Sequence, residues 1–187
     1  MIYLMRHGLD DENYIGGWSE VDLVEEGIRQ VKSTGEKMKS SNINIERIIT
    51  SDVKRAVTTS KIIREFYPNA KIEENILFRE QNKGVLNGME KEKAKRLYPD
   101  YFEFVTIDKT YEGGESLHDL YYRVKKYINY ILSTEDDTLI ITHRGVINMI
   151  YYILNNIELD MNKERFNVDH ASVHELDKEK RMIRKVF

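Results

Sequence analysis

The sequence predicts an α/β fold, a three-layer α/β/α sandwich with a mostly parallel central sheet. The apolar runs at residues 2–5 and 138–142 are continuous rather than alternating, which is typical of strands buried on both faces. Strand-like runs alternate along the chain with segments whose apolar residues have helical spacing. In a sheet of this kind, ligands bind beyond the carboxyl ends of the parallel strands.

The first half of the chain predicts three strands and two helices. In order they are a strand at 2–5, a helix at about 23–40, a strand at 47–50, a helix ending at about 66 and a short strand near 70–72. Ser51 or Asp52 can cap the second helix with its side chain, because both residue types are preferred at that position. Pro68 prevents this helix from continuing, because proline has no amide N–H.

The second half predicts the remaining elements around a loop-rich stretch. They are helices at 91–97, about 116–132 and about 146–154, a strand at 138–142, and closing strands near 172–176 and 182–186. Residues 80–114 hold four glycines and Pro99. We therefore expect a single domain over 1–187, with a lid-like insertion at about 80–114.

Composition and charge exclude several classes of protein. The chain has 187 residues, of which 41% are hydrophobic and 33% charged, and its formal net charge is −3. There is no basic excess of the kind that binds nucleic acid, and no apolar run long enough to span a membrane. The absence of cysteine excludes disulfides, thiolate nucleophiles and cysteine-ligated zinc. We expect a cytoplasmic protein with neither nucleic acid nor membrane as partner.

Basic and imidazole side chains follow three of the predicted strands. Arg6 and His7 follow the strand at 2–5, Arg55 follows the strand at 47–50, and His143 follows the strand at 138–142. Arginine binds phosphate through its planar fork of donors, and a neutral imidazole is a nucleophile that needs no metal. Arg6-His7-Gly8 alone would be interpreted as an ordinary polar strand end. Its combination with Arg55 and His143 favours a phosphoryl-transfer site.

A series of motifs identifies a family resemblance that covers nearly the whole chain. In order they are RHG at 6–8, GWSEVDL at 17–23, TSDVKRA at 50–56 with Thr59, FRE at 78–80, GGES at 113–116 and ITH at 141–143. Together they resemble the histidine phosphatase (phosphoglycerate mutase-like) superfamily, in its phosphatase branch. The resemblance implies a phosphoglycerate mutase-like fold.

The resemblance also implies roles for individual residues. His7 would be the nucleophile that forms a phosphohistidine intermediate. Glu80 would protonate the leaving oxygen and then activate water, and His143 would be the third catalytic residue. The side chains that bind the phosphoryl group would be Arg6, Arg55 and His143, with Asn13 assisting.

We expect no metal and no cofactor. The carboxylates of Asp10-Asp11-Glu12 could bind magnesium, but a solvated loop is the favoured interpretation because histidine chemistry needs no metal. His170 and His174 have the spacing of zinc ligands on a helix, yet their segment alternates like a strand, which argues against zinc. The expected enzyme is a metal-independent histidine phosphatase of acid or alkaline type, a phosphoric monoester hydrolase.

The resemblance leaves the reaction partly open. The segment from Gln81 to Glu112 is short and contains one arginine, Arg96, which favours a phosphatase over a cofactor-dependent phosphoglycerate mutase. The mutase is the main alternative, and a non-catalytic phosphate-binding or interaction module is a weaker one. The expected partner is a small phosphorylated metabolite such as α-ribazole phosphate, a sugar phosphate or a phosphoglycerate, and the expected state is a monomer or homodimer.

Overall fold

The computed structural model describes residues 1–103, 105–135 and 137–187 and shows a six-stranded central sheet. Its order is β3-β2-β4-β1-β5-β6, with strands β1 (Ile2–Arg6), β2 (Arg47–Thr50), β3 (Lys71–Glu74), β4 (Thr138–Thr142), β5 (Val173–Asp177) and β6 (Met182–Lys185). Strands β1 to β4 pair in parallel, whereas β5 and β6 pair antiparallel. The predicted mostly parallel sheet is confirmed.

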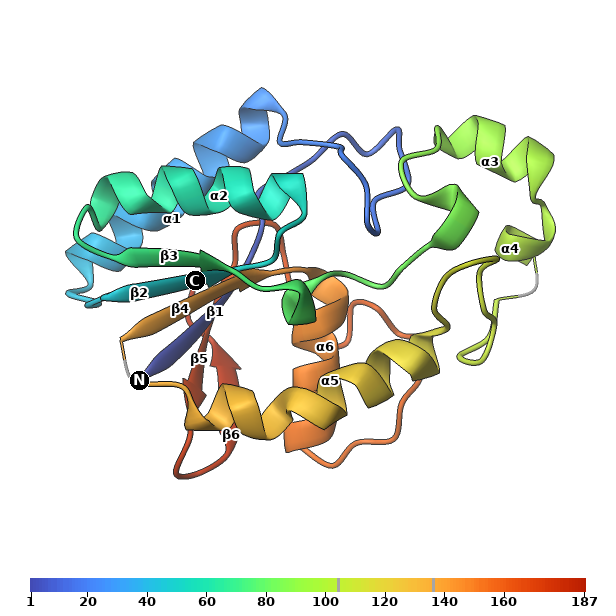
Figure 1. Cartoon of the computed structure of the whole chain (residues 1–187). Coiled ribbons are helices and arrows are strands. Elements are labelled where there is room, and N and C mark those ends of the chain that lie inside the picture. The colour runs from blue at the N-terminus through green and yellow to red at the C-terminus, as the bar shows by residue number, and fades with distance from the viewer. Residues whose placement is uncertain (104, 136) are drawn as a thin grey trace.

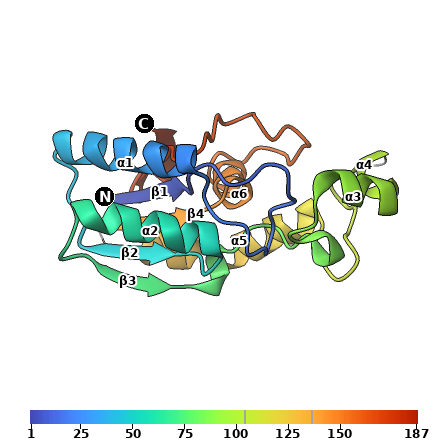
Figure 2. The same cartoon turned by 90° about the horizontal axis from the view of Figure 1, so that it is seen from above.

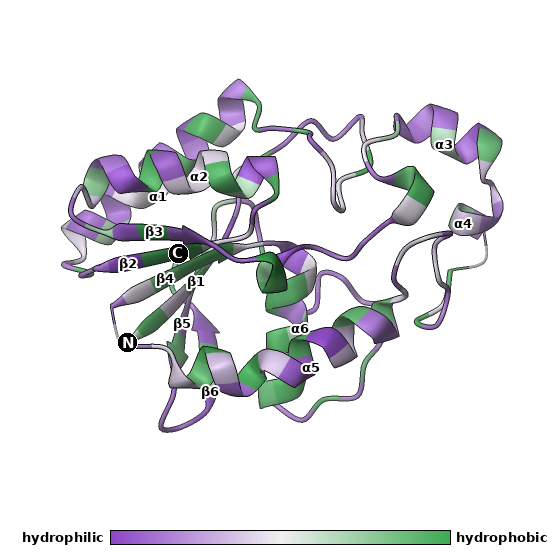
Figure 3. Cartoon of the chain, viewed as in Figure 1, coloured by the Kyte–Doolittle hydropathy of each residue, from purple (hydrophilic) through white to green (hydrophobic). Residues whose placement is uncertain are grey.

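Helices cover both faces of this sheet (Figures 1 and 2). Helices α1 (Glu25–Ser40) and α2 (Lys54–Phe66) lie on one face, and α5 (Leu117–Ser133) and α6 (Arg144–Leu154) lie on the other. Successive strand residues point to opposite faces, so Ile48 packs in the core under α1 and α2 while Ile49 packs in the core under α5 and α6. The apolar colouring of the inner strands in Figure 3 matches this burial, and the three-layer sandwich is confirmed.

The longest helix, α5, begins at a capping box. The Ser116 side chain accepts a hydrogen bond from the Asp119 amide, and the Asp119 carboxylate accepts one from the Ser116 amide. This cap fixes the helix start directly after Gly113-Gly114, as the sequence predicts. In the described part of the chain, no helix combines the length and the apolarity needed to cross a bilayer.

A smaller group of elements extends beyond the carboxyl ends of the parallel strands (Figures 1 and 2). It contains the short helices α3 (Lys91–Leu97) and α4 (Asp100–Glu103) and the 3-10 turn η2 (Gly84–Leu86), and it follows a further turn, η1 (Ile76–Phe78). Residue 104 of the predicted insertion lies outside the described residues. Backbone bonds from Ile15 to Met89, and from Gly88 back to Ile15, tie this segment to the loop after β1.

One predicted helix cap is wrong. Helix α2 begins at Lys54 after Val53, and no side chain caps it. Ser51 instead lies 2.9 Å from Nε2 of His143, and the Asp52 carboxylate accepts hydrogen bonds from Arg79. The Ser51 hydroxyl also accepts a hydrogen bond from the Val53 amide at 3.3 Å, before the helix begins, so neither predicted side chain caps α2.

Candidate active site

His7 lies directly after β1, and its hydrogen-bond partners determine which ring nitrogen carries the proton. Ring atom Nδ1 lies 2.7 Å from the Gly8 carbonyl oxygen, to which only an N–H can donate. Nε2 therefore carries the lone pair. Burial holds the pKa of His7 well below its ordinary value, and the nearby charges of Arg55 and His143 lower it further. His7 is thus a neutral imidazole with an unprotonated Nε2 near neutral pH.

Close packing explains the glycine that follows His7. A Cβ atom at Gly8 would lie 2.6 Å from the Gly27 carbonyl oxygen and 2.7 Å from Cγ2 of Val31, both on α1. These separations are far below van der Waals contact, so only glycine lets the chain leave β1 against this helix. The RHG motif therefore combines a cation, an imidazole and the backbone turn that places them.

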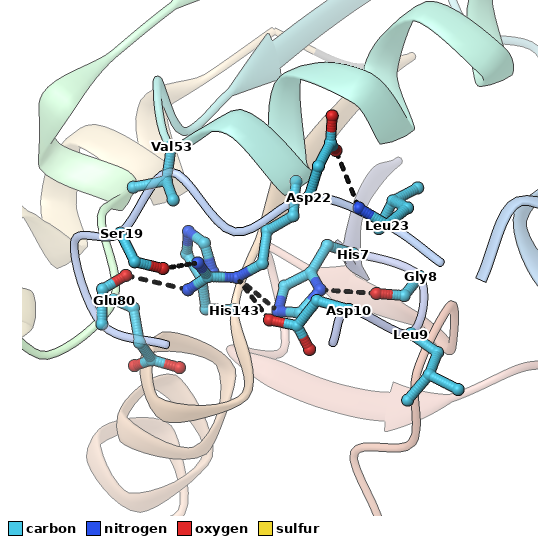
Figure 4. A network of polar contacts seen from close by, with 12 residues as sticks. His7, Gly8, Leu9, Asp10, Ser19, Asp22, Leu23, Val53, Glu80 and His143 are labelled. Atoms are coloured by element: carbon cyan, nitrogen blue, oxygen red, sulfur yellow. Dashed lines mark hydrogen bonds and ion pairs between the residues drawn. The ribbon is translucent and has the colours of Figure 1, made fainter. Parts of the chain in front are cut away.

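Arg55, on the first turn of α2, contacts His7 and His143. Figure 4 labels these two histidines in the same network of polar contacts, together with Asp10 and Glu80. Its guanidinium is 2% exposed and donates from Nε to His7 Nε2 at 3.2 Å. It also lies 3.1 Å from His143 Nδ1 and donates to the Gly17 carbonyl oxygen at 2.9 Å. Asp10 supplies a carboxylate oxygen 3.4 Å from Nε. Burial lowers the pKa of Arg55 from its ordinary value, although the group stays cationic at neutral pH.

His143 lies after β4, behind Arg55. Its ring is fully buried, with its centroid 5.1 Å from the His7 ring, and Nε2 lies 2.9 Å from Ser51 Oγ. Burial holds the pKa of His143 well below its ordinary value, and Arg55 adds to the shift. Its side chain supports the guanidinium from the interior.

Arg6, the last residue of β1, brings a second guanidinium to the same place. One of its terminal nitrogens donates to the Val168 carbonyl oxygen at 2.8 Å, and the other contacts Nε2 of His170. Its Nε is buried and has no hydrogen-bond partner among the described residues. Burial lowers the pKa of Arg6 to about 10, so it remains charged near neutral pH, with its Nε–H unused by the described residues.

Glu80 reaches the site from the loop after η1. One carboxylate oxygen accepts a hydrogen bond from the Gly145 amide at 3.1 Å, at the N-terminus of α6, and the other accepts from the Gln81 amide at 2.9 Å. Helix N-termini favour negative charge, so this contact holds the carboxylate in place. A Cβ at Gly145 would lie 2.1 Å from Glu80 Oε1, so a larger residue would displace the carboxylate.

These side chains share one pocket of about 270 Å³. Arg6, His7, Arg55 and Glu80 line it, and His143 lies behind Arg55. The structure does not bring Asn13 to this pocket: Asn13 is exposed, and its amide donates to Asp11 Oδ1 at 2.9 Å.

The pocket also contains side chains that were not predicted as site residues, namely Asp10, Lys83, Arg144, Lys163 and His170. Asp10, Lys83 and Arg144 each lie within three residues of a predicted site residue, which is a usable signal. The other two lie on the chain between α6 and β5, where no motif marks them.

The carboxylates and histidines considered earlier as metal ligands do not gather. Asp10 is not part of a solvated loop, because it packs beside Arg55. His170 lines the pocket, whereas His174 is buried in β5 between Tyr151 and Ser172. Across residues 1–103, 105–135 and 137–187, no group of three or more histidine, cysteine or acidic side chains could hold a metal ion.

Comparison with known proteins gives a consistent family. The chain is 30% identical over 135 residues to a 2,3-bisphosphoglycerate-dependent phosphoglycerate mutase of Methylocella silvestris, covering 68% of this chain and 66% of that protein. It is 33% identical over 163 residues to fructose-2,6-bisphosphatase of Saccharomyces cerevisiae, covering 83% of this chain and 34% of that protein.

A solved structure shares the fold over nearly the whole chain. The α-ribazole phosphatase of Shigella flexneri superposes with a TM-score of 0.81 at 16% identity, covering 99% of this chain and 94% of that one. The family description "histidine phosphatase superfamily (branch 1)" matches residues 2–186. The chain belongs to the histidine phosphatase superfamily.

Proposed function

We propose that this protein is a phosphomonoesterase that hydrolyses a small phosphorylated metabolite through a phosphohistidine on His7. The observation that carries the proposal is the state of His7. Its Nδ1–H is bound to a backbone carbonyl, its unprotonated Nε2 carries a lone pair that accepts a hydrogen bond from Arg55, and two buried guanidiniums converge beside it. This combination is a nucleophile inside an anion-binding site.

In the first step, His7 Nε2 attacks phosphorus, and the N–P bond forms as the bond to the ester oxygen breaks. Arg6 and Arg55 stabilise the negative charge of the transferring group, which is an electrostatic role that buried donors perform well. Arg6 Nε is a suitable donor because no described residue accepts from it. Protonated Glu80 gives its proton to the leaving oxygen, so the product leaves as an alcohol.

In the second step, water attacks the phosphohistidine. The Glu80 carboxylate takes a proton from this water, the new P–O bond forms, and the N–P bond breaks. Inorganic phosphate leaves and His7 regains its lone pair on Nε2. The contact of Glu80 with the α6 N-terminus suits the carboxylate that this step requires.

A mutase is the second candidate, because the Methylocella relative is named as one. A mutase returns the phosphoryl group to a bound intermediate, whereas a phosphatase passes it to water. We favour hydrolysis because the segment from Gln81 to Glu112 is short and contains one arginine. The phosphatase named among the solved structures of the same fold is consistent with this choice.

Trapping the phosphoenzyme tests the proposal. The wild type is mixed with labelled phosphoester and quenched in alkali, because a phosphoimidazole is stable to alkali and labile to acid. We expect label on the wild type, none on His7→Ala, and a loss of turnover in that variant of at least about 10³-fold. Label that persists in His7→Ala would assign the nucleophile to another residue, with His143 examined first.

Two further measurements define the reaction class. Inorganic phosphate should appear in equal amount to the alcohol, and transfer to a second acceptor in its place would establish the mutase. Turnover should continue in excess EDTA, since the proposed steps use only side chains. Loss of turnover in EDTA with recovery on adding magnesium would refute the metal-independent mechanism.

A further inference from the structure

The pocket contains more cations than the proposed phosphoryl chemistry uses. Lys83, Lys91, Arg144 and Lys163 line it in addition to Arg6 and Arg55. Arg144 pairs with Glu164 at 2.6 Å, so its charge has a protein partner. Among the described residues, no carboxylate pairs with the lysines at positions 83 and 163, so their charges require a separate explanation.

Lys83 is a half-buried ammonium with neutral neighbours. Its Nζ donates to Gln81 Oε1 at 2.5 Å and to the Tyr111 hydroxyl at 3.1 Å. An ammonium has three N–H donors, so one remains, and no carboxylate of the described residues pairs with it. Desolvation lowers the pKa of Lys83 to about 8, and the nearby Glu80 offsets only part of that shift.

The position of Lys83 is fixed by its surroundings. Its ammonium lies 4.5 Å from the centre of the Tyr111 ring, which in turn lies 5.3 Å from the Tyr101 ring. A Cβ at Gly17 would lie 2.8 Å from Lys83 Cγ, so the loop after β1 packs on the side-chain stem. Holding the ammonium in place reduces the entropy that is lost when it binds an anion.

Lys163 brings a second charge to the same part of the pocket. It lies on the exposed segment that follows α6, and no ion pair or side-chain hydrogen bond engages its ammonium in the described part of the chain. Lys83 and Lys163 line the same pocket. Desolvation lowers the pKa of Lys163, and repulsion from the Lys83 ammonium is the next cause. An anion between them would relieve that repulsion.

We propose that Lys83 and Lys163 form a subsite for a second anionic group, a carboxylate or a second phosphoryl group, on the leaving part of the substrate. The inference rests on the proposed function, which places the transferred phosphoryl group at His7 and the leaving oxygen at Glu80. Lys83 is three residues from Glu80 and lines the same pocket, so it faces the leaving group. The preferred substrates are then small phosphorylated acids or bisphosphates rather than phosphoesters whose leaving part carries no charge.

Matched substrate pairs test the subsite. The first pair is 3-phosphoglycerate and glycerol phosphate, which differ in a carboxylate, and the second is fructose 1,6-bisphosphate and fructose 1-phosphate, which differ in a phosphoryl group. In each pair, we call the substrate with the second anionic group the anionic member and the other the neutral member. We expect wild-type kcat/KM to favour the anionic member of at least one pair by about 10-fold or more. The pair that shows the preference identifies the anion.

Substitution of Lys83 assigns the preference to this residue. Lys83→Met should abolish most of the preference and leave kcat/KM for the neutral member within about twofold, whereas Lys83→Arg should keep it. Lys163→Met should have a smaller effect in the same direction. Lys93→Met, on the exposed face of α3 away from the pocket lining, removes the same charge and should change nothing.

Two results would overturn the subsite. One is a wild type that hydrolyses neutral and anionic members equally well, with the phosphohistidine of His7 still trapped, in which case the proposed function stands alone. The other is an equal loss of kcat/KM for both members of the pair in Lys83→Met, which would show that Lys83 has a structural role and does not bind the second anionic group. If turnover is absent altogether, calorimetric binding of both members to His7→Ala, with and without Lys83→Met, measures the same preference independently of the chemistry.

Discussion

The two ends of the pocket are built in different ways. At the end where we propose that the phosphoryl group binds (the phosphoryl end), Arg6, His7, Arg55 and His143 are all 9% exposed or less. Their side chains contact one another or the backbone around them. At the opposite end, where we propose that the leaving group binds (the leaving-group end), the charges lie on loops, and Lys163 is exposed. The first end is suited to a phosphoryl group, which is the same in every substrate. The second end can accept leaving groups of different structure.

The difference also concerns how charge is handled. At the phosphoryl end, burial keeps both histidines neutral and lowers the pKa of both arginines, and the Asp10 carboxylate partly balances Arg55. At the other end, Lys83 relies on the hydroxyl and amide oxygens of Tyr111 and Gln81. Substitutions at the first end should therefore affect every substrate, whereas those at the second should affect only some.

Glu80 lies between the two ends, and its removal should give the largest effect that depends on the leaving group. Glu80→Gln keeps the size of the side chain and removes the transferable proton. Esters with alkoxide leaving groups should lose on the order of 10²–10⁴-fold in kcat. The leaving group of an aryl phosphate needs less help from an acid, so the rate of phosphoenzyme formation should fall less with this substrate. The phosphoenzyme should then accumulate, because its hydrolysis still requires the Glu80 carboxylate. Stopped-flow product release and alkaline trapping measure both quantities.

A neighbouring arginine supplies the control for Glu80. Arg123 donates to the Glu80 and Arg79 carbonyl oxygens at 3.0 and 3.1 Å and pairs with Glu115 at 2.7 Å, so it fixes the backbone that carries the acid. Arg123→Met should weaken turnover without removing the proton, and it should leave less phosphoenzyme than Glu80→Gln does. Equal losses of Glu80→Gln on alkyl and aryl esters, with no phosphoenzyme, would make Glu80 a structural carboxylate.

The next largest effect should come from Arg55 and should not depend on the leaving group. Arg55→Met keeps much of the volume and removes the charge that contacts both histidines. We expect kcat/KM to fall by about 10²–10³-fold for alkyl and aryl phosphates alike, because both present the same phosphoryl group. Thermal melting of the variant separates this loss from unfolding. If kcat/KM falls only for alkyl or only for aryl phosphates, Arg55 acts on the leaving group and not on the shared phosphoryl group.

The same contrast explains how much the sequence can predict. Arg6, His7 and His143 directly follow apolar strand runs, and parallel strands end at one edge of a sheet, so their convergence follows from local patterns. Arg55 follows from the same pattern, because it comes shortly after the strand at 47–50, whereas Glu80 comes from the family resemblance alone. The structure brings both to the pocket. The same patterns predict the α/β/α sandwich with its mostly parallel sheet, whereas the family resemblance implies the phosphoglycerate mutase-like form of that fold.

The remaining features depend on tertiary packing that no local pattern encodes. Ser51 does not cap α2, because the helix begins three residues later, at Lys54, and a distant strand end brings His143 to the Ser51 hydroxyl. Asn13 is directed to Asp11 by a contact within its own loop. Lys163 and His170 reach the pocket only because the long segment after α6 returns to β5 past the carboxyl ends of the strands.

The smallest expected effect uses pH to separate the two ends. Lys83, with its pKa near 8, loses its charge as pH rises through that value, while the arginines stay charged and the histidines stay neutral. The charged groups that act on Lys83 are Glu80, Glu115, Arg144 and Lys163, with the neutral Tyr111 hydroxyl beside it. Preference for the anionic member of a substrate pair should therefore be full at neutral pH. It should decline by up to about 10-fold by about pH 9.

The neutral member of the pair is the reference, because a pH effect on the groups that act on the phosphoryl group and the leaving oxygen changes kcat/KM of both members alike and cancels in their ratio. Lys83→Arg should keep its preference for the anionic member up to the highest pH tested, since guanidinium does not deprotonate in this range. The substrate phosphoryl group titrates near pH 6, so the comparison begins at about pH 7, where that group is already charged. A decline that persists in Lys83→Arg would come from another group, with Lys163 the first to be substituted. A wild-type preference that does not change with pH would show that Lys83 stays protonated throughout, and the contrast between the two ends would then lie in geometry rather than in charge.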